Sequence, residues 1–421
     1  MVKTLQTKAG YIVAMLAFFV FFAGLAYSYW LGDTLRYFDE GDYYAIAQNL
    51  ALKGFFSTDG LSPSLFRPPG YPFMLSVAVW MGAGVVQLRA INFALLAGCV
   101  VLVYALLRKH VTPLAGLSGA IMVLCYPVLF YTAGALYPQT LGAFLLLASL
   151  WILIGRDQGT SKALSHNKSS VRHLLAGVAF GFLILVIPTF IVSLLVTTLW
   201  LSLGRRMLKS ACIVTIAALV IVGIWTIRNY LIFKTFVPVS ANSGVMLIAG
   251  NSENTTANSG ISTDINKYFN VANSLPETER DAFYRAHAIA YMQANPGRMA
   301  LLYISKLANY FNFRNELLTK DQASPLNNIV MLLTYYPLLI LAVLMSIKIK
   351  SLPLSRYEWL LVGLCIADAL FSAIFFTRIR YRLPFDFLVI LLGAGYLAKH
   401  FKALNPHLRV LSHPPPESHP R

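Results

Sequence analysis

Three carboxylates stand within four residues, directly after the first long apolar run of the chain. They are Asp39, Glu40 and Asp42, with aromatic neighbours at Tyr37, Phe38, Tyr43 and Tyr44. Acids at the start of a helix are stabilised by its dipole, so helix capping is one interpretation of the cluster. Capping needs only one or two acids, however, and a carboxylate can also accept the proton of an attacking hydroxyl. The oxygen atoms of the cluster could also bind a hard divalent cation.

Arg67 lies in a segment whose prolines restrict the backbone. Residues 66–72 have the sequence FRPPGYP, and each proline fixes its own φ angle. A lone arginine at a membrane interface often reaches the lipid headgroups without forming a specific site. A rigid backbone favours a dedicated phosphate site here, because a guanidinium held in one direction matches phosphate oxygens.

Arginines also cluster near the end of the chain, at Arg378, Arg380 and Arg382. They are expected at the outer end of two apolar runs, against the usual preference of basic residues for the inside. Arg382 and Asp386 could form a helix pair four residues apart. Capture of a phosphate is the better account of Arg378 and Arg380, since guanidinium groups match phosphate oxygens.

The composition is that of an integral membrane protein. Of 421 residues, 57% are hydrophobic and only 12% are charged. Lys and Arg number 34 against 17 Asp and Glu, and they lie mainly between apolar runs, which indicates membrane topology rather than nucleic acid binding. The four cysteines lie in apolar stretches and predict neither a disulfide framework nor a zinc site.

The apolar runs predict about ten spanning helices with both termini in the cytoplasm. Segment 173–203 is broken at Pro188, and the basic clusters on both sides of it are all placed inside only if it crosses twice. Segment 71–86 is short for a span, so we expect an interfacial or re-entrant helix. The remaining runs occupy roughly 11–30, 89–107, 113–131, 135–154, 210–227, 325–347, 357–376 and 383–400.

This topology divides the chain into one membrane domain and a tail. Residues 1–400 form the membrane domain, and 401–421 form a cytoplasmic, disordered tail. Two long exterior segments, 31–88 and 228–324, are where function is expected. Within the second we expect an amphipathic helix over 277–292, in a loop that is either purely structural or a cover for a substrate.

Several short motifs, taken in order, resemble the GT-C superfamily of glycosyltransferases. They are DEGDYY at 39–44, RPPGYP at 67–72, WTIRNY at 225–230, PVS at 238–240, AGN at 249–251 and RYRLP at 380–384. More narrowly, the chain resembles bacterial relatives of the protein O-mannosyltransferases and of the lipid A aminoarabinose transferase, over about residues 11–397. The resemblance implies an all-α polytopic bundle of about ten transmembrane helices, with two long exterior loops carrying juxtamembrane helices.

The resemblance also implies roles for individual residues. Asp39 takes the position of the catalytic acid, and Arg67 that of the basic residue that contacts the carrier phosphate. The aminoarabinose transferases have an acidic residue immediately before that position, where this chain has Phe66, and Asp42 is the nearest substitute. The full candidate set is Asp39, Glu40 and Asp42 for catalysis; Arg67, Arg378, Arg380 and Arg382 for the donor phosphate; and Tyr43, Tyr71, Arg228, Asn229 and Asn251 for substrate binding.

The resulting hypothesis is a glycosyltransferase of the plasma (bacterial inner) membrane. It would move a hexose or pentose from a polyprenyl phosphate to a hydroxyl of a glycan, lipid or protein on the exterior face. No cofactor is expected beyond the divalent cation that the acidic cluster could hold, and metal ligands are otherwise unknown. The alternatives are a transporter or flippase of lipid-linked sugars, although the sequence has no clear internal repeat, and a non-catalytic assembly subunit.

Overall fold

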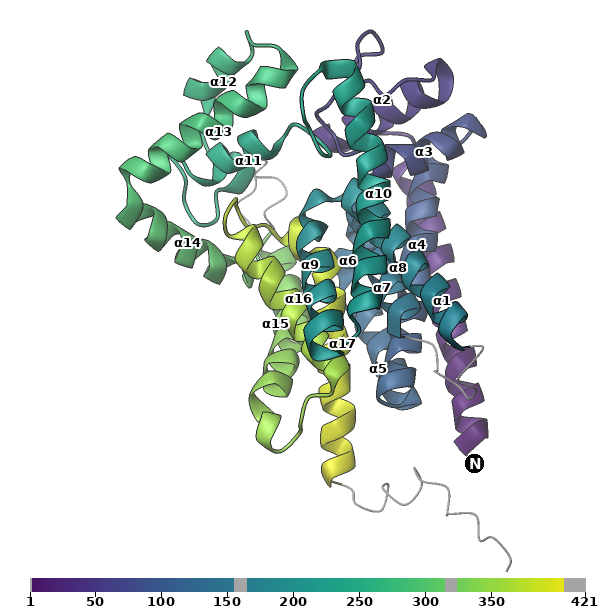
Figure 1. The fold of residues 1–421 in the computed structure, drawn as a ribbon. Coiled ribbons are helices and arrows are strands. Elements are labelled where there is room, and N and C mark those ends of the chain that lie inside the picture. The colour runs from purple at the N-terminus through teal and green to yellow at the C-terminus, as the bar shows by residue number, and fades with distance from the viewer. Residues whose placement is uncertain (1, 155–164, 315–323, 405–421) are drawn as a thin grey trace, which may run out of the picture.

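The computed structural model describes residues 2–154, 165–314 and 324–404, and the regular secondary structure of these ranges is helical. The all-α expectation is therefore confirmed. The long helices run side by side, and most of the short helices gather at one end of the bundle, away from the N-terminus (Figure 1). We call this end the cap end. Most of the predicted tail, 401–421, lies outside the described residues.

Five helices are long and apolar enough to cross a membrane, which agrees with a membrane protein. A sixth crossing would come from α5 (Pro113–Leu124) and α6 (Pro127–Ala133), which are bent by 62° relative to each other. The count of about ten spans stays a prediction, because the other apolar helices among the described residues are shorter. The five long helices are α1 (Val2–Leu31), α4 (Val85–His110), α10 (Leu208–Phe233), α15 (Pro325–Ile347) and α17 (Ile379–Leu404).

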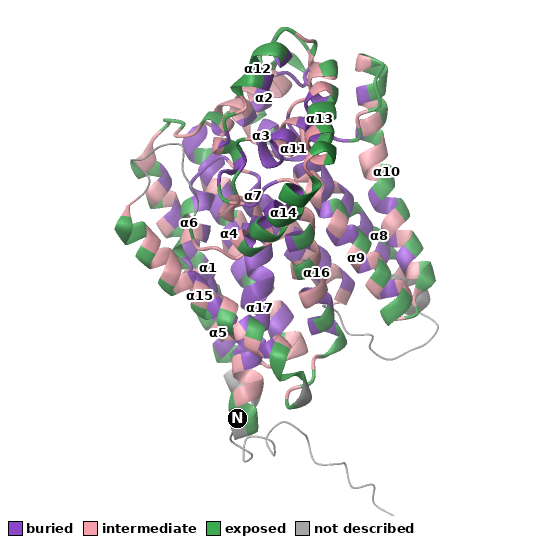
Figure 2. Cartoon of the chain, turned by 90° about the vertical axis from the view of Figure 1, so that its left-hand side faces the viewer, coloured by how far each residue is buried: buried purple, intermediate pink, exposed green. Residues whose placement is uncertain are grey.

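Helix α17 is the central helix of the bundle. The most apolar stretch of α17 is 83% buried, against 22% for the most apolar stretches of α1 and α15. Figure 2 shows burial along much of the length of α17. It packs against α15, α5, α7 (Gln139–Ile154) and α16 (Arg356–Ser372). Arg380 and Arg382, in its first turn, are thus attached to the most enclosed element of the molecule.

Segment 173–203 runs along the bundle and folds back, while the prediction that it crosses the membrane twice stays a prediction. Helix α8 (Ser165–Val186) stops just before Pro188, and the chain continues as η1 (Pro188–Phe190), α9 (Ile191–Leu199) and η2 (Trp200–Gly204). Arg172 near the start of α8 and Arg205 after η2 line the same pocket. The chain therefore leaves this end of the bundle and returns to it, as the basic clusters predicted.

Segment 71–86 does not cross as a helix. Helix α3 (Gly70–Trp80) has 11 residues, which is about 16 Å against a hydrocarbon core of about 30 Å. It packs on α2 (Phe38–Lys53) and on α8. Gly70 allows the close approach to α8, because a Cβ there would lie 2.7 Å from the backbone nitrogen of Val186.

The described residues of segment 228–324, which was predicted to be exterior, are folded rather than an open loop. They form α11 (Ser243–Gly250), η3 (Gly260–Ser262), α12 (Asn266–Ala272), α13 (Glu277–Ala294) and α14 (Pro296–Tyr310). Helix α13 matches the amphipathic helix predicted at 277–292. Ile248, Tyr268 and Tyr284 contribute to a small apolar core that joins α11, α12 and α13. We call residues 243–310 the cap.

Candidate active site

Asp39 forms ion pairs with two arginines that are distant in the sequence. Its Oδ1 accepts a hydrogen bond from Nη2 of Arg67 at 2.6 Å, and its Oδ2 accepts one from Nη1 of Arg380 at 2.6 Å. The Arg67 guanidinium also donates to Asp42, from Nη2 at 2.6 Å and from Nε at 3.0 Å. Two carboxylates and two guanidiniums therefore meet at the cap end, on α2, on the loop before α3 and on α17.

The electrostatics keep Asp39 ionised. Burial by itself would raise the pKa of this carboxyl, but Arg380 and Arg67 outweigh burial and hold the pKa below its ordinary value of 3.8. The side chains of Asp39 and Arg380 are still 17% and 27% exposed, so a substrate can reach both. The cluster is thus a charged site that is partly open to solvent.

Aromatic rings frame the two guanidiniums. Arg67 lies 5.3 Å from the ring centre of Tyr43, and Arg380 lies 4.6 Å from that of Tyr137. Tyr37 stacks on Tyr137 at 5.6 Å, and the Tyr381 hydroxyl accepts a hydrogen bond from Arg380 at 3.1 Å. Tyr137 was missed by sequence reasoning because it lies at the edge of an apolar run and belongs to none of the motifs.

Glu40 faces away from this cluster. Its carboxylate is fully buried and accepts hydrogen bonds from the backbone N–H groups of Arg36, Tyr37 and Leu136, at 2.7, 2.9 and 2.8 Å. It therefore holds the start of α2 against the chain before α7. The capping interpretation describes Glu40, whereas Asp39 and Asp42 face the arginines.

The described contacts of Arg382 and Arg378 are with groups other than Asp39 and Asp42. Arg382 is buried, pairs with Asp386 at 2.9 Å and lies 3.7 Å from the ring centre of Tyr335. The helix-pair alternative is therefore the arrangement found, and the phosphate role expected for Arg382 does not fit its enclosed position. Arg378 donates to the Ser262 hydroxyl at 3.2 Å, which ties the start of α17 to the cap.

Of the residues expected to bind substrate, some contact the site and others have a structural role. The Tyr71 hydroxyl is buried against Asn92, and the Asn229 amide donates to the carbonyl of Val237 at 2.9 Å. Tyr71 therefore contacts a neighbouring helix, and Asn229 holds the backbone at Val237. Tyr43 alone of the five contacts Arg67 directly.

Arg228 and Asn251 lie near the site but also hold the chain together. Arg228 stacks on Trp225 at 4.5 Å and reaches the carbonyl of Ser64, three residues before Arg67, at 3.4 Å. Asn251 donates to the carbonyl of Ile374 at 2.9 Å.

Lys306 on α14 joins the cap to the segment that leads into α17. Its Nζ donates to the carbonyls of Gly250 and Phe375 and to Oδ1 of Asn251, at 3.0, 2.8 and 3.0 Å. Lys306 is 1% exposed, so these oxygen atoms replace its water shell. We call residues 373–378 the strap. This role could not be predicted from the sequence, because Lys306 stands alone in an amphipathic pattern.

An apolar groove of about 650 Å³ lies between α9, α10, α14 and α16. Leu194, Leu219 and Phe371 are among its walls, and Ile374 of the strap is one of its lining residues. The groove therefore adjoins the strap, a few residues before Arg380.

The acidic cluster does not fit a divalent cation in this arrangement. In the described part of the chain, no group of three or more His, Cys, Asp or Glu side chains converges. Asp39 and Asp42 face Arg67, whose charge opposes a cation, while Glu40 is turned toward backbone N–H groups.

The chain matches no protein family model and no curated protein sequence. It is similar in structure to the archaeal oligosaccharyltransferase AglB from Archaeoglobus fulgidus, in complex with an inhibitory peptide and a dolichol-phosphate. The TM-score is 0.55 at 14% identity, over 100% of this chain and 53% of AglB. The same enzyme tethered with an acceptor peptide containing the NVT sequon gives a TM-score of 0.55 at 15% identity, over 97% and 51%.

ArnT from Cupriavidus metallidurans, bound to undecaprenyl phosphate, gives a TM-score of 0.44 at 14% identity, over 98% of this chain and 82% of ArnT. This chain spans about half the length of the AglB structures that it matches. The AglB matches confirm the fold that the motifs predicted, which is the GT-C fold of polytopic membrane proteins.

Proposed function

We propose that this protein is a membrane glycosyltransferase that moves a sugar from a polyprenyl-phosphate carrier to an acceptor hydroxyl. The observation that carries the proposal is the shared contact of Asp39 with Arg67 and Arg380. A carboxylate that can accept a proton thus lies within hydrogen-bond distance of each of two cations that can hold a phosphate. The similarity to AglB, whose structure holds a dolichol-phosphate, supports a lipid-linked donor.

The reaction would be a single displacement at the anomeric carbon. The acceptor oxygen forms the new bond to this carbon, while the bond to the phosphate oxygen of the carrier breaks and the polyprenyl phosphate leaves. Asp39 takes the proton of the acceptor hydroxyl, and Arg67 with Arg380 stabilises the negative charge that grows on the phosphate. The displacement inverts the configuration at that carbon.

Donor binding would also activate the base. Without donor, Arg67 and Arg380 neutralise Asp39 and lower its pKa, which makes it a weak proton acceptor. A donor phosphate competes for the same guanidiniums. Once they turn toward the phosphate, the pKa of Asp39 rises toward its ordinary value, and Asp42 remains to hold Arg67.

The surroundings of the site support a donor with a long hydrocarbon tail. The apolar groove beside the strap could hold part of the isoprenoid chain, and its volume of about 650 Å³ suits a segment of several isoprene units. We place the cap end on the exterior face and both termini in the cytoplasm, in line with the basic clusters at the other end. The donor sugar is a hexose or a pentose, and the acceptor is a glycan, lipid or protein.

Transfer of radiolabelled sugar in native membranes tests this function directly. Full-length wild type would be given a panel of polyprenyl-phosphate hexoses and pentoses, beside Asp39→Asn and the control Asp264→Asn, an exposed acid on the cap. We expect Asp39→Asn to lower transfer by about 10²- to 10⁴-fold at matched expression, because it removes the base. Asp264→Asn should behave as wild type.

Unaffected transfer in Asp39→Asn would remove this residue from the mechanism. No transfer by wild type with any donor would instead favour transport of a lipid-linked sugar.

A further inference from the structure

A polar cavity lies at the end of the bundle opposite Asp39. It has a volume of about 290 Å³ and opens between α4, α7, α8, η2 and the start of α16. Helix α4 has 26 residues and runs from the cap end to this cavity, so about 40 Å separate the two sites. Five basic side chains from four separate segments line the cavity: His110, Arg172, His173, Arg205 and Arg356.

The arginines Arg172, Arg205 and Arg356 bring positive charge to the lining of the cavity. None of its described lining residues is acidic. The nearest acid along the chain, Glu358, is 3% exposed and accepts hydrogen bonds from Lys399 at 2.6 Å and from the backbone of Ser355 at 2.7 Å. Because like charges repel more strongly in a partly enclosed space than in water, an anion in the cavity would stabilise the protein.

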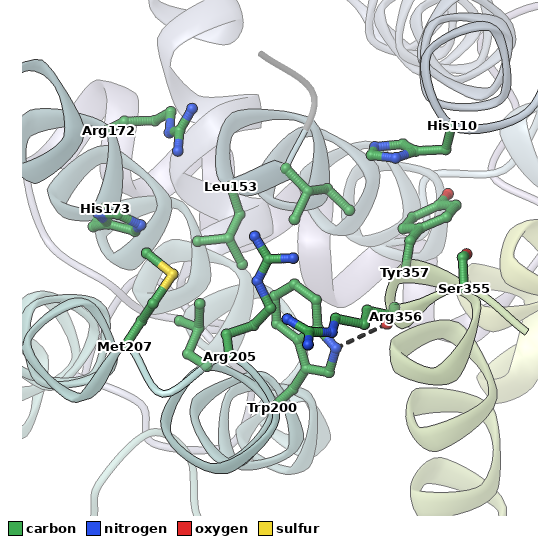
Figure 3. Close-up of a pocket in the computed structure, with 12 residues that line it drawn as sticks. His110, Leu153, Arg172, His173, Trp200, Arg205, Met207, Ser355, Arg356 and Tyr357 are labelled. Carbon is green, nitrogen blue, oxygen red and sulfur yellow. Dashed lines mark hydrogen bonds between the residues drawn. The ribbon is translucent and has the colours of Figure 1, made fainter. Parts of the chain in front are cut away.

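Aromatic residues contact the side chains of Arg205 and His110 and the backbone of Arg356. The indole N–H of Trp200 donates to the carbonyl of Arg356 at 2.9 Å, and Arg205 lies 5.5 Å from the Trp200 ring centre. His110 stacks on Tyr357 at 4.3 Å. Figure 3 shows the side chains of Arg172, Arg205 and Arg356 around one hollow, with Trp200 below Arg205.

This construction differs from that of basic residues that only orient a membrane protein. Arg205 is half-buried and Arg356 is exposed at the rim, and both line the cavity, whereas the exposed Arg108 and Lys209 at the same end do not. Residues Trp200–Gly204 form a π-helix, and Arg206, two residues after its end, has φ 53°. Such π-turns are rare and are often found at functional sites. Here the π-turn leads directly into Arg205.

We propose that this cavity binds the phosphate of an anionic lipid headgroup in the leaflet at this end of the bundle. Guanidinium groups match phosphate oxygens, and basic pockets between membrane helices are suited to lipid phosphates. The cavity lies at the end of the candidate span α4, and Leu153, Leu201 and Tyr357 give it apolar walls against which glycerol and acyl groups can pack. A soluble phosphate has the same charged oxygens as the headgroup, but it has no apolar part that could pack against these walls. The site is independent of the reaction at the cap end.

Lipid binding to the full-length protein tests the site. Wild type, the double variant Arg205→Gln/Arg356→Gln and the control Arg108→Gln/Lys209→Gln would be purified in neutral detergent. Each would be titrated with phosphatidylglycerol, phosphatidylcholine or inorganic phosphate. Native mass spectrometry would count bound lipid, and thermal unfolding would report Tm. Both variants lose two positive charges from the same end.

We expect phosphatidylglycerol to bind wild type and the control and to raise their Tm, with little effect of phosphatidylcholine. In the pocket variant, the dissociation constant for phosphatidylglycerol should rise about tenfold or more, since each lost charged hydrogen bond is worth about that factor. Its Tm without lipid reports whether it folds. Equal binding by the two variants would overturn the site. A pocket-dependent effect of inorganic phosphate without one of phosphatidylglycerol would overturn its assignment to a lipid.

Discussion

Arg380 and Arg382 are two residues apart, yet they have opposite surroundings. Successive helical residues are rotated by about 100°, so these two side chains leave α17 on nearly opposite sides. Arg380 reaches Asp39, whereas Arg382 is enclosed by Asp386 and Tyr335. Which of the two meets the site is set by the rotation of α17 about its axis.

The ion pairs of Asp39 predict an unusual pH dependence of transfer. The pKa of Asp39 lies below 3.8 when no donor is bound. The acid limb of kcat/KM, which reports the free enzyme, should therefore lie below about pH 4, and the rate should not fall between pH 7 and 5. Arg380→Gln removes one of the cations that lower this pKa, so its acid limb should move to higher pH.

The pH profiles of kcat/KM for wild type and Arg380→Gln measure this shift, apart from any loss of overall rate. An acid limb at the same pH in both proteins would contradict the role of Arg380 in ionising Asp39. The same pair contributes to stability above the ordinary pKa of Asp39, and that contribution is lost as the pH falls below about 4.

At the scale of elements, the strap connects the cap to the start of α17, which carries Arg380. Lys306 fixes Phe375 to the cap, and the strap then enters α17 within a few residues. Gly250 allows the contact, because a Cβ there would fall 1.8 Å from the carbonyl oxygen of Phe375. The cap thus acts on the site through backbone contacts.

Lys306→Met should weaken donor binding with a smaller effect on folding. It keeps the apolar stem but removes the hydrogen bonds to the strap, so we expect KM for the donor to rise about tenfold. Lys267→Met, which changes a lysine side chain that is 76% exposed on the same cap, is the matched control. Steady-state kinetics with a Tm measurement would test the change.

Gly250→Ala should move KM in the same direction, because it pushes the strap away without altering a charge. Unchanged KM in both variants would show that the strap does not position Arg380.

For the whole molecule, the two ends of the bundle differ in character. The cap end gathers the Asp39 cluster and the cap, whereas the opposite end gathers His110, Arg205 and Arg356. The preference of basic residues for the cytoplasm then predicts the side on which each end lies.

Labelling with a membrane-impermeant maleimide tests this orientation. In a variant without native cysteines, Asp264→Cys on the cap should react in intact cells. Lys209→Cys at the basic end should react only after the membrane is permeabilised. The reverse pattern would place the candidate active site in the cytoplasm.

The sequence by itself determined the membrane character, the all-helical class and the fold. Apolar runs, proline breaks and basic clusters act locally, so the break at Pro188 and the short helix α3 could be predicted from them. Asp39 and Arg67 were also visible as candidates, because each stands in a short motif with an unusual charge or backbone.

Only the tertiary structure decided which polar groups meet. Asp39 and Arg380 are 341 positions apart, and their contact depends on how α17 packs in the centre of the bundle. The same packing turned Glu40 toward backbone N–H groups, enclosed Arg382, and brought Tyr137 and Lys306 to the site region. Spacing along a chain specifies the face of one helix, but the rotation and depth of that helix among the others come from the sum of many side-chain contacts.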